Sequence, residues 1–210
     1  MTIAFDGRFN LERVTIMPGE HHGTREERII ATLLGSCVAV AVYDPANGVS
    51  GMNHFMLPGT TGEQFYLTDS GRYGMYAMDL LIGALVKLGG NRKSFRAKVF
   101  GGGSVLQLTG DQTPKVAESN VRFAFEYLEA ESIPVVSSDV GGTEGRQVLL
   151  FTATAKVLVR KIRRDKIAPL RSEELNHLKS IRQKVRKPGT EAVVFDDLST
   201  TRDTRGDQRQ

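Results

Sequence analysis

The sequence predicts an α+β fold, because its strands come in runs instead of alternating regularly with helices. Two adjacent segments rich in small and β-branched residues lie in the first third of the chain, and three further strand-like segments follow one another after residue 132. Two amphipathic helical segments, with one strand between them, separate these runs. Strands that are neighbours in sequence tend to pair directly, so this order favours α+β over repeated βαβ units.

Length and composition are those of one globular domain. The chain has 210 residues, of which 40% are hydrophobic and 25% charged. No apolar stretch approaches the roughly 18–20 residues that cross a bilayer, and the first ten residues lack the apolar core of a signal peptide. We therefore expect one cytoplasmic domain over residues 1–198 without membrane insertion, followed by a polar, disordered tail at 199–210.

The strands of the first third are interpreted from composition and turn signals. The first 28 residues look irregular apart from one short strand that ends at Pro18-Gly19. The predicted strands are Arg13–Met17, Ile29–Leu34, Cys37–Tyr43 and Val49–Leu57, with a strong turn signal at Asp44–Gly48. The last two strands are expected to form a hairpin around that turn.

Three segments have the apolar spacing of amphipathic helices. In the first, apolar residues from Met75 to Leu88 fall on one face, and Gly89-Gly90 provides a C-terminal stop. The second, Val116–Glu131, follows the helix-start signal Thr113-Pro114. The third is Ser172–Arg186, whose apolar side consists of Leu175, Leu178, Ile181 and Val185.

The remaining strands flank two glycine-rich segments. They are predicted at Arg96–Phe100, Ile133–Val140, Gln147–Thr152 and Lys156–Ile162, with a terminal edge strand at Ala192–Phe195. The run Gly101–Ser104 lacks the Gly-Lys-Ser/Thr ending of a phosphate-binding loop, which favours a tight turn or close backbone packing. Gly141–Arg146 is interpreted as a hairpin-type loop.

Charge and histidine placement favour neither a nucleic-acid site nor a metal site. The formal net charge is +4, with basic residues concentrated between Lys156 and Lys187. Little aromatic interleaving accompanies them, and Glu173 and Glu174 interrupt the run, so we interpret this region as a solvated surface. The pair His21-His22 lies in a polar stretch typical of a solvated loop. With a single Cys, the chain forms no intrachain disulfide and no Cys-based zinc cluster.

The single cysteine, Cys37, is the strongest candidate for chemistry. A lone Cys in a cytosolic protein is more often an inert buried residue. Cys37, however, follows Gly35-Ser36, a turn whose N–H groups can point at a developing oxyanion just before a strand begins. Because a free thiol has a pKa of about 8.5, a nucleophilic Cys needs a neighbouring base at neutral pH. We interpret Cys37 as a candidate nucleophile, with Gly35 and Ser36 supporting the oxyanion.

His54 is the candidate base because the predicted hairpin brings it near Cys37. If the hairpin is centred on the turn, two residues lie opposite each other when their numbers add up to about 91–93. The numbers of Cys37 and His54 add up to 91. The two side chains then share one face within reach of a hydrogen bond. No carboxylate lies nearby in sequence to orient the imidazole, whereas Thr32, on the preceding strand, is placed to bond its second nitrogen.

Several separated blocks of this sequence together resemble a known family. They are Thr32–Pro45, which contains Gly-Ser-Cys37, then Gly51–Pro58, which contains His54, and then Phe100–Gly103, Asn120-Val121, Ile133–Val136 and Asp139–Arg146. In this order the blocks resemble CheD, the family of chemoreceptor glutamine deamidases. The resemblance extends over about residues 10–165, most of the expected domain.

The resemblance implies both a fold and an activity. The implied fold is a β-sandwich of mixed sheets flanked by outer helices, similar to the catalytic domain of cytotoxic necrotising factor. The implied catalytic group is Cys37, His54 and Thr32, acting on glutamine side chains, and on glutamyl methyl esters as a second class, in the cytoplasmic helices of chemoreceptors. A CheC-type phosphatase is an implied class of partner. The implied chemistry needs no metal or cofactor.

Two other functions stay open on sequence grounds. The first is a catalytically silent adaptor that binds a signalling protein through the same surface. Its Cys37 would not be activated, so thiol reactivity separates it from an enzyme. The second is a basic nucleic-acid-binding domain, which predicts salt-dependent retention on DNA through the charges of Arg160–Lys166.

Overall fold

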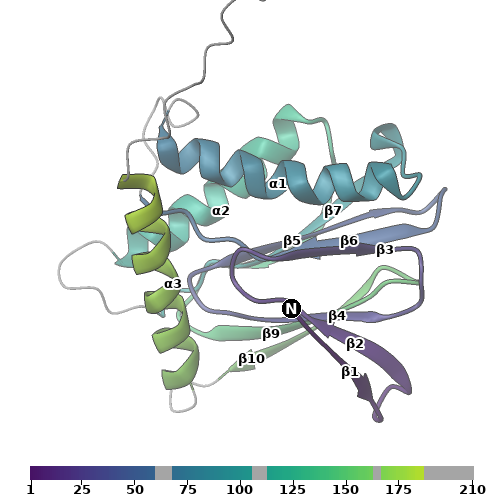
Figure 1. Ribbon diagram of the computed structural model, residues 1–210, viewed down its shortest axis with the longest axis horizontal. Coiled ribbons are helices and arrows are strands. Elements are labelled where there is room, and N and C mark those ends of the chain that lie inside the picture. Colours follow the sequence, from purple (N-terminus) through teal and green to yellow (C-terminus); the bar gives the residue numbers. More distant parts are fainter. Residues whose placement is uncertain (60–67, 106–112, 163–166, 187–210) are drawn as a thin grey trace, which may run out of the picture.

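The computed structural model describes residues 1–59, 68–105, 113–162 and 167–186. Within these residues, ten strands form two five-stranded sheets that lie one above the other, with three long helices outside them (Figure 1). The predicted α+β sandwich of mixed sheets with outer helices is confirmed. The more specific likeness to cytotoxic necrotising factor stays a prediction.

The first sheet has the strand order β1-β2-β4-β9-β10. Its strands are β1 (Thr2–Asp6), β2 (Leu11–Thr15), β4 (Ile29–Leu34), β9 (Gly145–Phe151) and β10 (Lys156–Ile162). The β2–β4 pair is parallel, and the other neighbours are antiparallel. The strand β4, which carries Thr32, therefore lies at the centre of this sheet.

The second sheet has the strand order β3-β6-β5-β7-β8. Its strands are β3 (His21–Thr24), β5 (Val38–Asp44), β6 (Val49–Asn53), β7 (Arg96–Gly101) and β8 (Val135–Val140). The predicted hairpin is confirmed as the antiparallel β5–β6 pair. The β7–β8 pair is parallel, and the chain crosses between these two strands through a helix.

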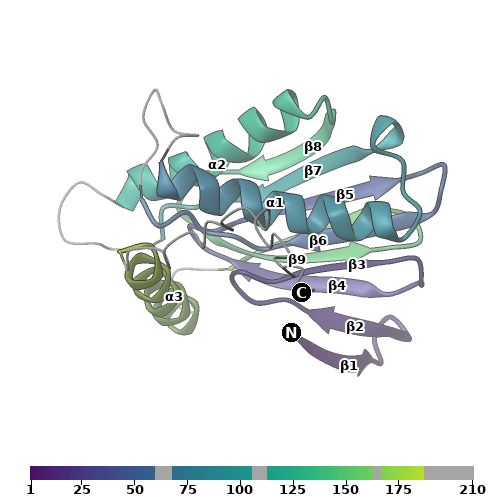
Figure 2. The same ribbon diagram turned by 45° about the horizontal axis from the view of Figure 1, so that its top comes forward.

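Two of the helices cover one face of the second sheet, and the third lies elsewhere. The helices α1 (Asp69–Lys87) and α2 (Thr113–Ala130) pack on the outer face of the second sheet (Figure 1). The Thr68 side chain caps α1 by accepting from the Gly71 N–H, and α1 ends at the predicted glycine stop. The helix α3 (Ala168–Arg186) lies against one end of the sandwich, as both views show (Figures 1 and 2).

Alternate residues of β5, together with Cys37, which directly precedes it, belong to two different cores. The residues Val38, Val40 and Val42 join the core beneath α1 and α2, whereas Cys37, Ala39 and Ala41 join the core between the two sheets. This is the period-two alternation of a strand that is buried on both faces. The side chain of Cys37 therefore points into the space between the sheets.

The prediction of an irregular N-terminal segment is wrong, apart from the short strand predicted at Arg13–Met17, which overlaps β2. The residues before Ile29 include three strands, and His21 and His22 lie half-buried in β3 instead of in a solvated loop. The strand β3 pairs with β6, and β2 pairs with β4. The strand β3 is short and polar, so its pairing with β6 orders it where local composition gives no signal.

The interpretation of Gly141–Arg146 as a hairpin loop is also wrong. The strands on either side of this segment belong to different sheets, because β8 pairs with β7 whereas β9 pairs with β4 and β10. The segment carries the chain from one sheet to the other through two glycines with positive φ, Gly141 and Gly142. A local turn signal does not reveal which strands the turn connects.

Three other predictions cannot be compared with the structure. The edge strand Ala192–Phe195 and the tail at 199–210 lie outside the described residues. The extent of the single domain, residues 1–198, also stays a prediction.

The other glycine-rich segment is the predicted tight turn with close backbone packing. Gly101 and Gly102 have φ values of 106° and 64°. The Gly102 N–H donates to the Cys37 carbonyl and the Gly103 N–H to the Gly35 carbonyl, each at 2.7 Å. A Cβ at Gly101 would lie 2.3 Å from the Cys37 carbonyl oxygen. The segment is therefore rich in glycine because it packs directly against the backbone around Cys37.

We expect Gly101→Ala to be much more destabilising than Gly142→Ala. Both glycines have positive φ, but a Cβ at Gly142 meets nothing within 4 Å. Left-handed strain alone costs about 1–2 kcal/mol, whereas Gly101→Ala must also displace the Cys37 carbonyl. Urea denaturation of both variants measures the difference, and equal losses would show that the close approach at Gly101 is unimportant.

Candidate active site

The turn that precedes β5 directs its N–H groups into the space between the sheets. Its carbonyl groups are bonded to the glycine-rich turn and to Asn120, a fully buried residue of α2 whose Nδ2 donates to the Ser36 carbonyl at 2.8 Å. The Asn120 Oδ1 accepts from the Leu57 N–H, also at 2.8 Å. Because a trans peptide directs its C=O and N–H groups oppositely, the N–H groups of Ser36 and Cys37 point away from these partners.

His54 follows β6 and reaches the same space from the neighbouring strand. The β5–β6 ladder pairs residues whose numbers sum to 93, and a bridge between Val38 and Phe55 continues this register. His54 is therefore diagonal to Cys37 instead of directly opposite, and the two side chains still share one face. The backbone N–H of His54 donates to the Glu20 carbonyl at 2.9 Å, which anchors the residue beyond the end of β6.

Thr32, in the first sheet, bonds the imidazole of His54 as predicted. The distance between Thr32 Oγ1 and His54 Nδ1 is 2.8 Å, and Thr32 Oγ1 also donates to the Ile16 carbonyl at 2.8 Å. Because the hydroxyl proton is used on the carbonyl, Nδ1 of His54 must carry the proton that Thr32 accepts. The other nitrogen, Nε2, is then unprotonated, and it is buried without a hydrogen-bond partner.

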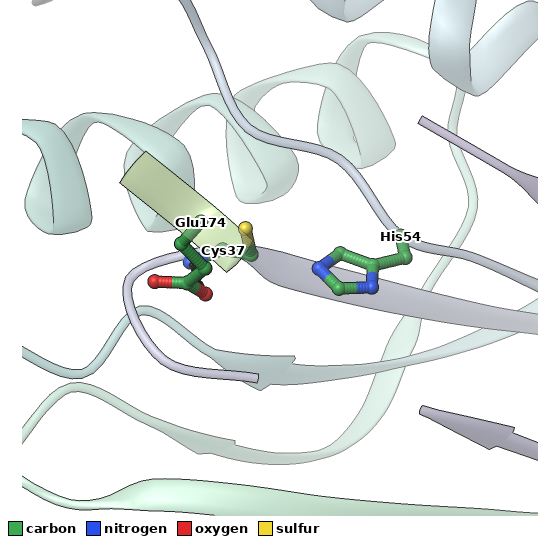
Figure 3. Close-up of side chains that lie close together, drawn as sticks. All are labelled: Cys37, His54 and Glu174. Carbon is green, nitrogen blue, oxygen red and sulfur yellow. Dashed lines mark hydrogen bonds between the residues drawn. The ribbon is translucent and has the colours of Figure 1, made fainter. Parts of the chain in front are cut away.

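The free nitrogen of His54 faces the thiol. Figure 3 shows the ring nitrogen farther from the main chain pointing toward Cys37. Both residues are almost completely buried, with exposed fractions of 0% for Cys37 and 1% for His54. Burial, together with a smaller effect of the nearby His177, lowers the pKa of His54 to about 3. Burial also raises the pKa of the Cys37 thiol. In this structure the pair is a neutral thiol beside a neutral imidazole.

A residue that the sequence did not indicate completes the site. Glu174, on α3, is fully buried, and its carboxylate lies against the turn before β5. Its Oε1 accepts from the N–H groups of Gly35 (2.8 Å) and Cys37 (3.1 Å). Its Oε2 accepts from the N–H (2.9 Å) and hydroxyl (2.8 Å) of Ser36. Three successive backbone N–H groups thus converge on one carboxylate, as an oxyanion site requires.

Cys37, His54 and Glu174 offer one ligand atom each within 4.8 Å of one another. A thiolate, an imidazole and a carboxylate are all ligands that zinc accepts. Both oxygens of Glu174, however, already accept two hydrogen bonds each from the turn. The arrangement therefore fits the binding of a carbonyl or carboxylate group better than the binding of a metal ion.

The charge pattern of α3 gives no indication from the sequence that Glu174 contributes to the site. The charge pattern predicts Glu173 and Glu174 to be solvated residues that interrupt a basic surface, whereas Glu174 is buried. One sequence signal does exist. Leu170, Glu174 and Leu178 are spaced by one helical turn each, so a carboxylate occupies the centre of an otherwise apolar stripe.

Comparison with known proteins identifies the family. A family model described as CheD chemotactic sensory transduction matches residues 56–161. A probable chemoreceptor glutamine deamidase CheD 1 of Shewanella oneidensis is 45% identical over 160 residues, which are 76% of this chain and 77% of the relative. The chain belongs to the CheD family. The segment matched by the family model begins after Cys37 and His54, so the geometry described above carries the assignment of the site.

One other CheD relative matches a larger share of the chain than the Shewanella oneidensis protein does. A probable chemoreceptor glutamine deamidase CheD of Methylobacillus flagellatus is 39% identical over 193 residues, 91% of this chain and 93% of the relative. At most a tenth of the chain lies outside this match, so the match includes α3. A CheD 2 protein of Chromobacterium violaceum is 44% identical over 160 residues, 76% of this chain and 79% of the relative.

Solved structures resemble only part of this CheD-family chain. The Bacillus licheniformis hypothetical protein YfiH has a TM-score of 0.36 at 17% identity, covering 57% of this chain and 50% of its own. A Neisseria meningitidis protein has a TM-score of 0.37 at 12% identity, covering 59% and 53% of the two chains. Partial likeness of this degree supports no functional argument. Among the described residues, no helix is long and apolar enough to cross a membrane.

The buried, neutral state of His54 predicts a loss of stability in acid. Its pKa of about 3 in the folded protein lies below the value of about 6.5 expected for an unfolded chain, so between these values the unfolded state binds more protons. The free energy of unfolding should fall as pH drops from 6.5, by about 1.4 kcal/mol per pH unit for this one group.

Urea midpoints measured from pH 7 to pH 4 test this expectation, with His54→Asn as the comparison. Because burial also lowers the pKa values of His21, His22 and His177, the variant should keep part of the pH dependence. An unchanged slope in His54→Asn would contradict the assignment of a neutral imidazole to this site.

Proposed function

We propose that this protein hydrolyses the side-chain amide of glutamine to glutamate on other proteins, with Cys37 as nucleophile. One observation carries the proposal. The only cysteine lies beside the unprotonated nitrogen of a histidine whose other nitrogen is held by Thr32, and backbone N–H groups converge next to it. A nucleophile, an oriented base and an oxyanion site are the three parts that acyl transfer needs.

In the first step, His54 activates the thiol. Nε2 of His54 takes the proton of Cys37 as the sulfur attacks the amide carbon of the substrate glutamine. Thr32 keeps the proton on Nδ1, so that Nε2 is available as acceptor and the imidazolium that forms keeps a hydrogen-bond partner. Thr32 is a positioning residue, because it acts on the reaction only through His54.

The negative charge that develops on the amide oxygen is stabilised by the turn. The N–H groups of Gly35 and Cys37 converge on one oxygen of the Glu174 carboxylate, and Ser36 supplies its N–H and hydroxyl to the other. A carbonyl oxygen at either position would receive two donors without any rearrangement of the backbone. Removal of one such donor from an oxyanion site typically costs about 10²–10³-fold in rate.

The reaction is completed by water. The tetrahedral intermediate collapses as the C–N bond breaks, and ammonia leaves with the proton held by His54. The substrate is then joined to Cys37 as a thioester. His54 takes a proton from a water molecule that attacks the thioester, and the products are glutamate and the free thiol.

The CheD relatives support chemoreceptors as the substrate. Their names describe probable chemoreceptor glutamine deamidases, and we propose glutamines on the cytoplasmic helices of chemoreceptors as the groups that this protein modifies. The site of action is then the cytoplasm. Methylesterase activity on the same helices and binding of a CheC-type phosphatase stay predictions.

Cys37→Ala is expected to abolish glutamine hydrolysis without unfolding the protein. The substitution removes one sulfur from the core between the sheets, and a deletion of this size usually costs about 1–2 kcal/mol of stability. Mass spectrometry of a receptor cytoplasmic fragment measures the conversion of Gln to Glu, and circular dichroism checks the fold. Continued conversion by the folded variant would contradict the mechanism, and a wild-type protein without activity would favour an adaptor.

Substitutions at His54 and Thr32 should differ in severity. We expect His54→Ala to lower kcat by about 10²–10⁴-fold, because the group that transfers the proton is lost. Thr32→Val keeps the size of the side chain and removes only the orienting hydroxyl, so its effect should be smaller. The same assay under saturating substrate compares the two variants. Equal and small effects would show that His54 is not the base.

A further inference from the structure

The oxyanion site is occupied in this structure by a side chain of the same protein. All four hydrogen bonds described for the Glu174 carboxylate come from Gly35, Ser36 and Cys37. A Cβ on Gly35 would lie 2.6 Å from Glu174 Oε2, so the carboxylate fits against the bare backbone of a glycine. No other acceptor is needed to satisfy this turn while α3 is in place.

The chemistry of this occupant matches the product of the proposed reaction. Glutamate is what glutamine hydrolysis leaves, and here a glutamate side chain projects from a helix, with one carboxylate oxygen between Gly35 and Cys37. An amide would fit less well than the carboxylate, because its NH₂ group cannot accept the N–H of Ser36. Glu174 is therefore held as a product glutamate would be held after hydrolysis.

The remainder of α3 is bound in the manner of a helix in a groove. Leu178 and Ile181 join the core between the two sheets, and Leu170 packs with Val105. The guanidinium of Arg182 donates from Nε to the Pro58 carbonyl at 2.7 Å. Apolar anchors spaced by one helical turn on either side of a central residue are the pattern by which amphipathic helices bind protein grooves.

The position of α3 also opposes formation of the reactive ion pair. The charge of Glu174, and its hydrogen bond, add to burial in raising the pKa of Cys37. His177, also on α3, adds to burial in lowering the pKa of His54. Both effects disfavour the thiolate–imidazolium state, and the complete burial of Cys37 leaves a substrate no access to the sulfur.

We propose that α3 is an autoinhibitory helix that occupies the substrate-helix groove, with Glu174 in the place of the product glutamate. The helix must leave before a receptor helix can present its glutamine to Cys37, so α3 and the substrate compete for one groove. This regulation rests on the proposed function. The closure of the site by α3, in contrast, can be measured without any deamidase activity.

The first test is the accessibility of the thiol in the full-length protein. Glu174→Ala removes the carboxylate from the turn, whereas Glu173→Ala removes the adjacent carboxylate, which bonds none of these N–H groups in the described structure. We expect alkylation of Cys37 by iodoacetamide to become at least about tenfold faster in Glu174→Ala, because both exposure and thiolate fraction increase. In Glu173→Ala it should change less than about threefold. Equal rates in the wild type and both variants would overturn the proposal.

The second test turns the side chain at position 174 of α3 into a substrate for Cys37 of the same molecule. The glutamine introduced by Glu174→Gln is placed at the oxyanion site, so Cys37 should attack its amide carbon and release ammonia, and water should cleave the resulting intrachain thioester to restore glutamate. Peptide mass spectrometry should show conversion at position 174 over time, and none in the Cys37→Ala/Glu174→Gln double variant. Gln183, exposed on the same helix, is the internal control and should stay unconverted.

The outcomes separate the two proposals. If receptor glutamines are converted but the glutamine at position 174 is not, α3 does not occupy the product position, and the autoinhibitory role is wrong. If no glutamine is converted anywhere while Glu174→Ala still exposes Cys37, the site is closed by α3 but the proposed function is wrong. A Glu174→Ala variant with lower activity and unchanged alkylation would make Glu174 a structural support, which also overturns the proposal.

Discussion

Three successive backbone N–H groups, at Gly35, Ser36 and Cys37, converge on one small space between the sheets and the end helix. A buried N–H without a partner costs about 1–3 kcal/mol, so these groups require an acceptor whenever the site is closed. The glycine-rich turn at Gly101–Gly103 and the amide of Asn120 hold the carbonyls of the same turn and so fix the direction of the N–H groups.

A site of this kind binds any group that presents oxygen with negative charge. The oxyanion of a tetrahedral intermediate and the carboxylate of Glu174 accept hydrogen bonds from the same N–H groups of the turn. The two groups therefore cannot bind there at the same time. The strength of the donors that favours catalysis therefore also favours binding of the product-like side chain. Competition between an internal helix and a substrate helix follows directly from this conflict, because α3 carries both the carboxylate and the apolar anchors that hold it.

The parts of the site that sequence could predict are those joined by short connections. Cys37 directly precedes the first strand of one hairpin and His54 directly follows the second, so the position of the turn places both side chains on one face. Thr32 lies in the other sheet, and its proximity along the chain, together with family resemblance, indicated it. Glu174 is 137 residues from Cys37 and lies within a run of charges. The apolar neighbours one helical turn away on either side indicate that it is buried, but they do not indicate which turn its carboxylate contacts.

The same distinction applies to the fold. Helices α1 and α2 and the β5–β6 hairpin follow from periodicity and turn signals, which are properties of short segments. The strand β3 and the crossing at Gly141–Arg146 depend on partners farther away in sequence, because β3 pairs with β6 and β8 pairs with β7. Short polar strands and ambiguous turns acquire their structure from those partners, and composition alone does not identify them.

One set of N–H groups, at Gly35, Ser36 and Cys37, binds Glu174 of α3 and the substrate glutamine in turn. Hydrogen exchange measures this competition directly. The Cys37→Ala variant is compared without a receptor helix and with a saturating concentration of a receptor helix that carries its glutamines. We expect the amides of α3 to lose protection when the receptor helix binds, while those of Gly35, Ser36 and residue 37 stay protected. Undiminished protection of α3 in the bound state would contradict the exchange of one helix for the other.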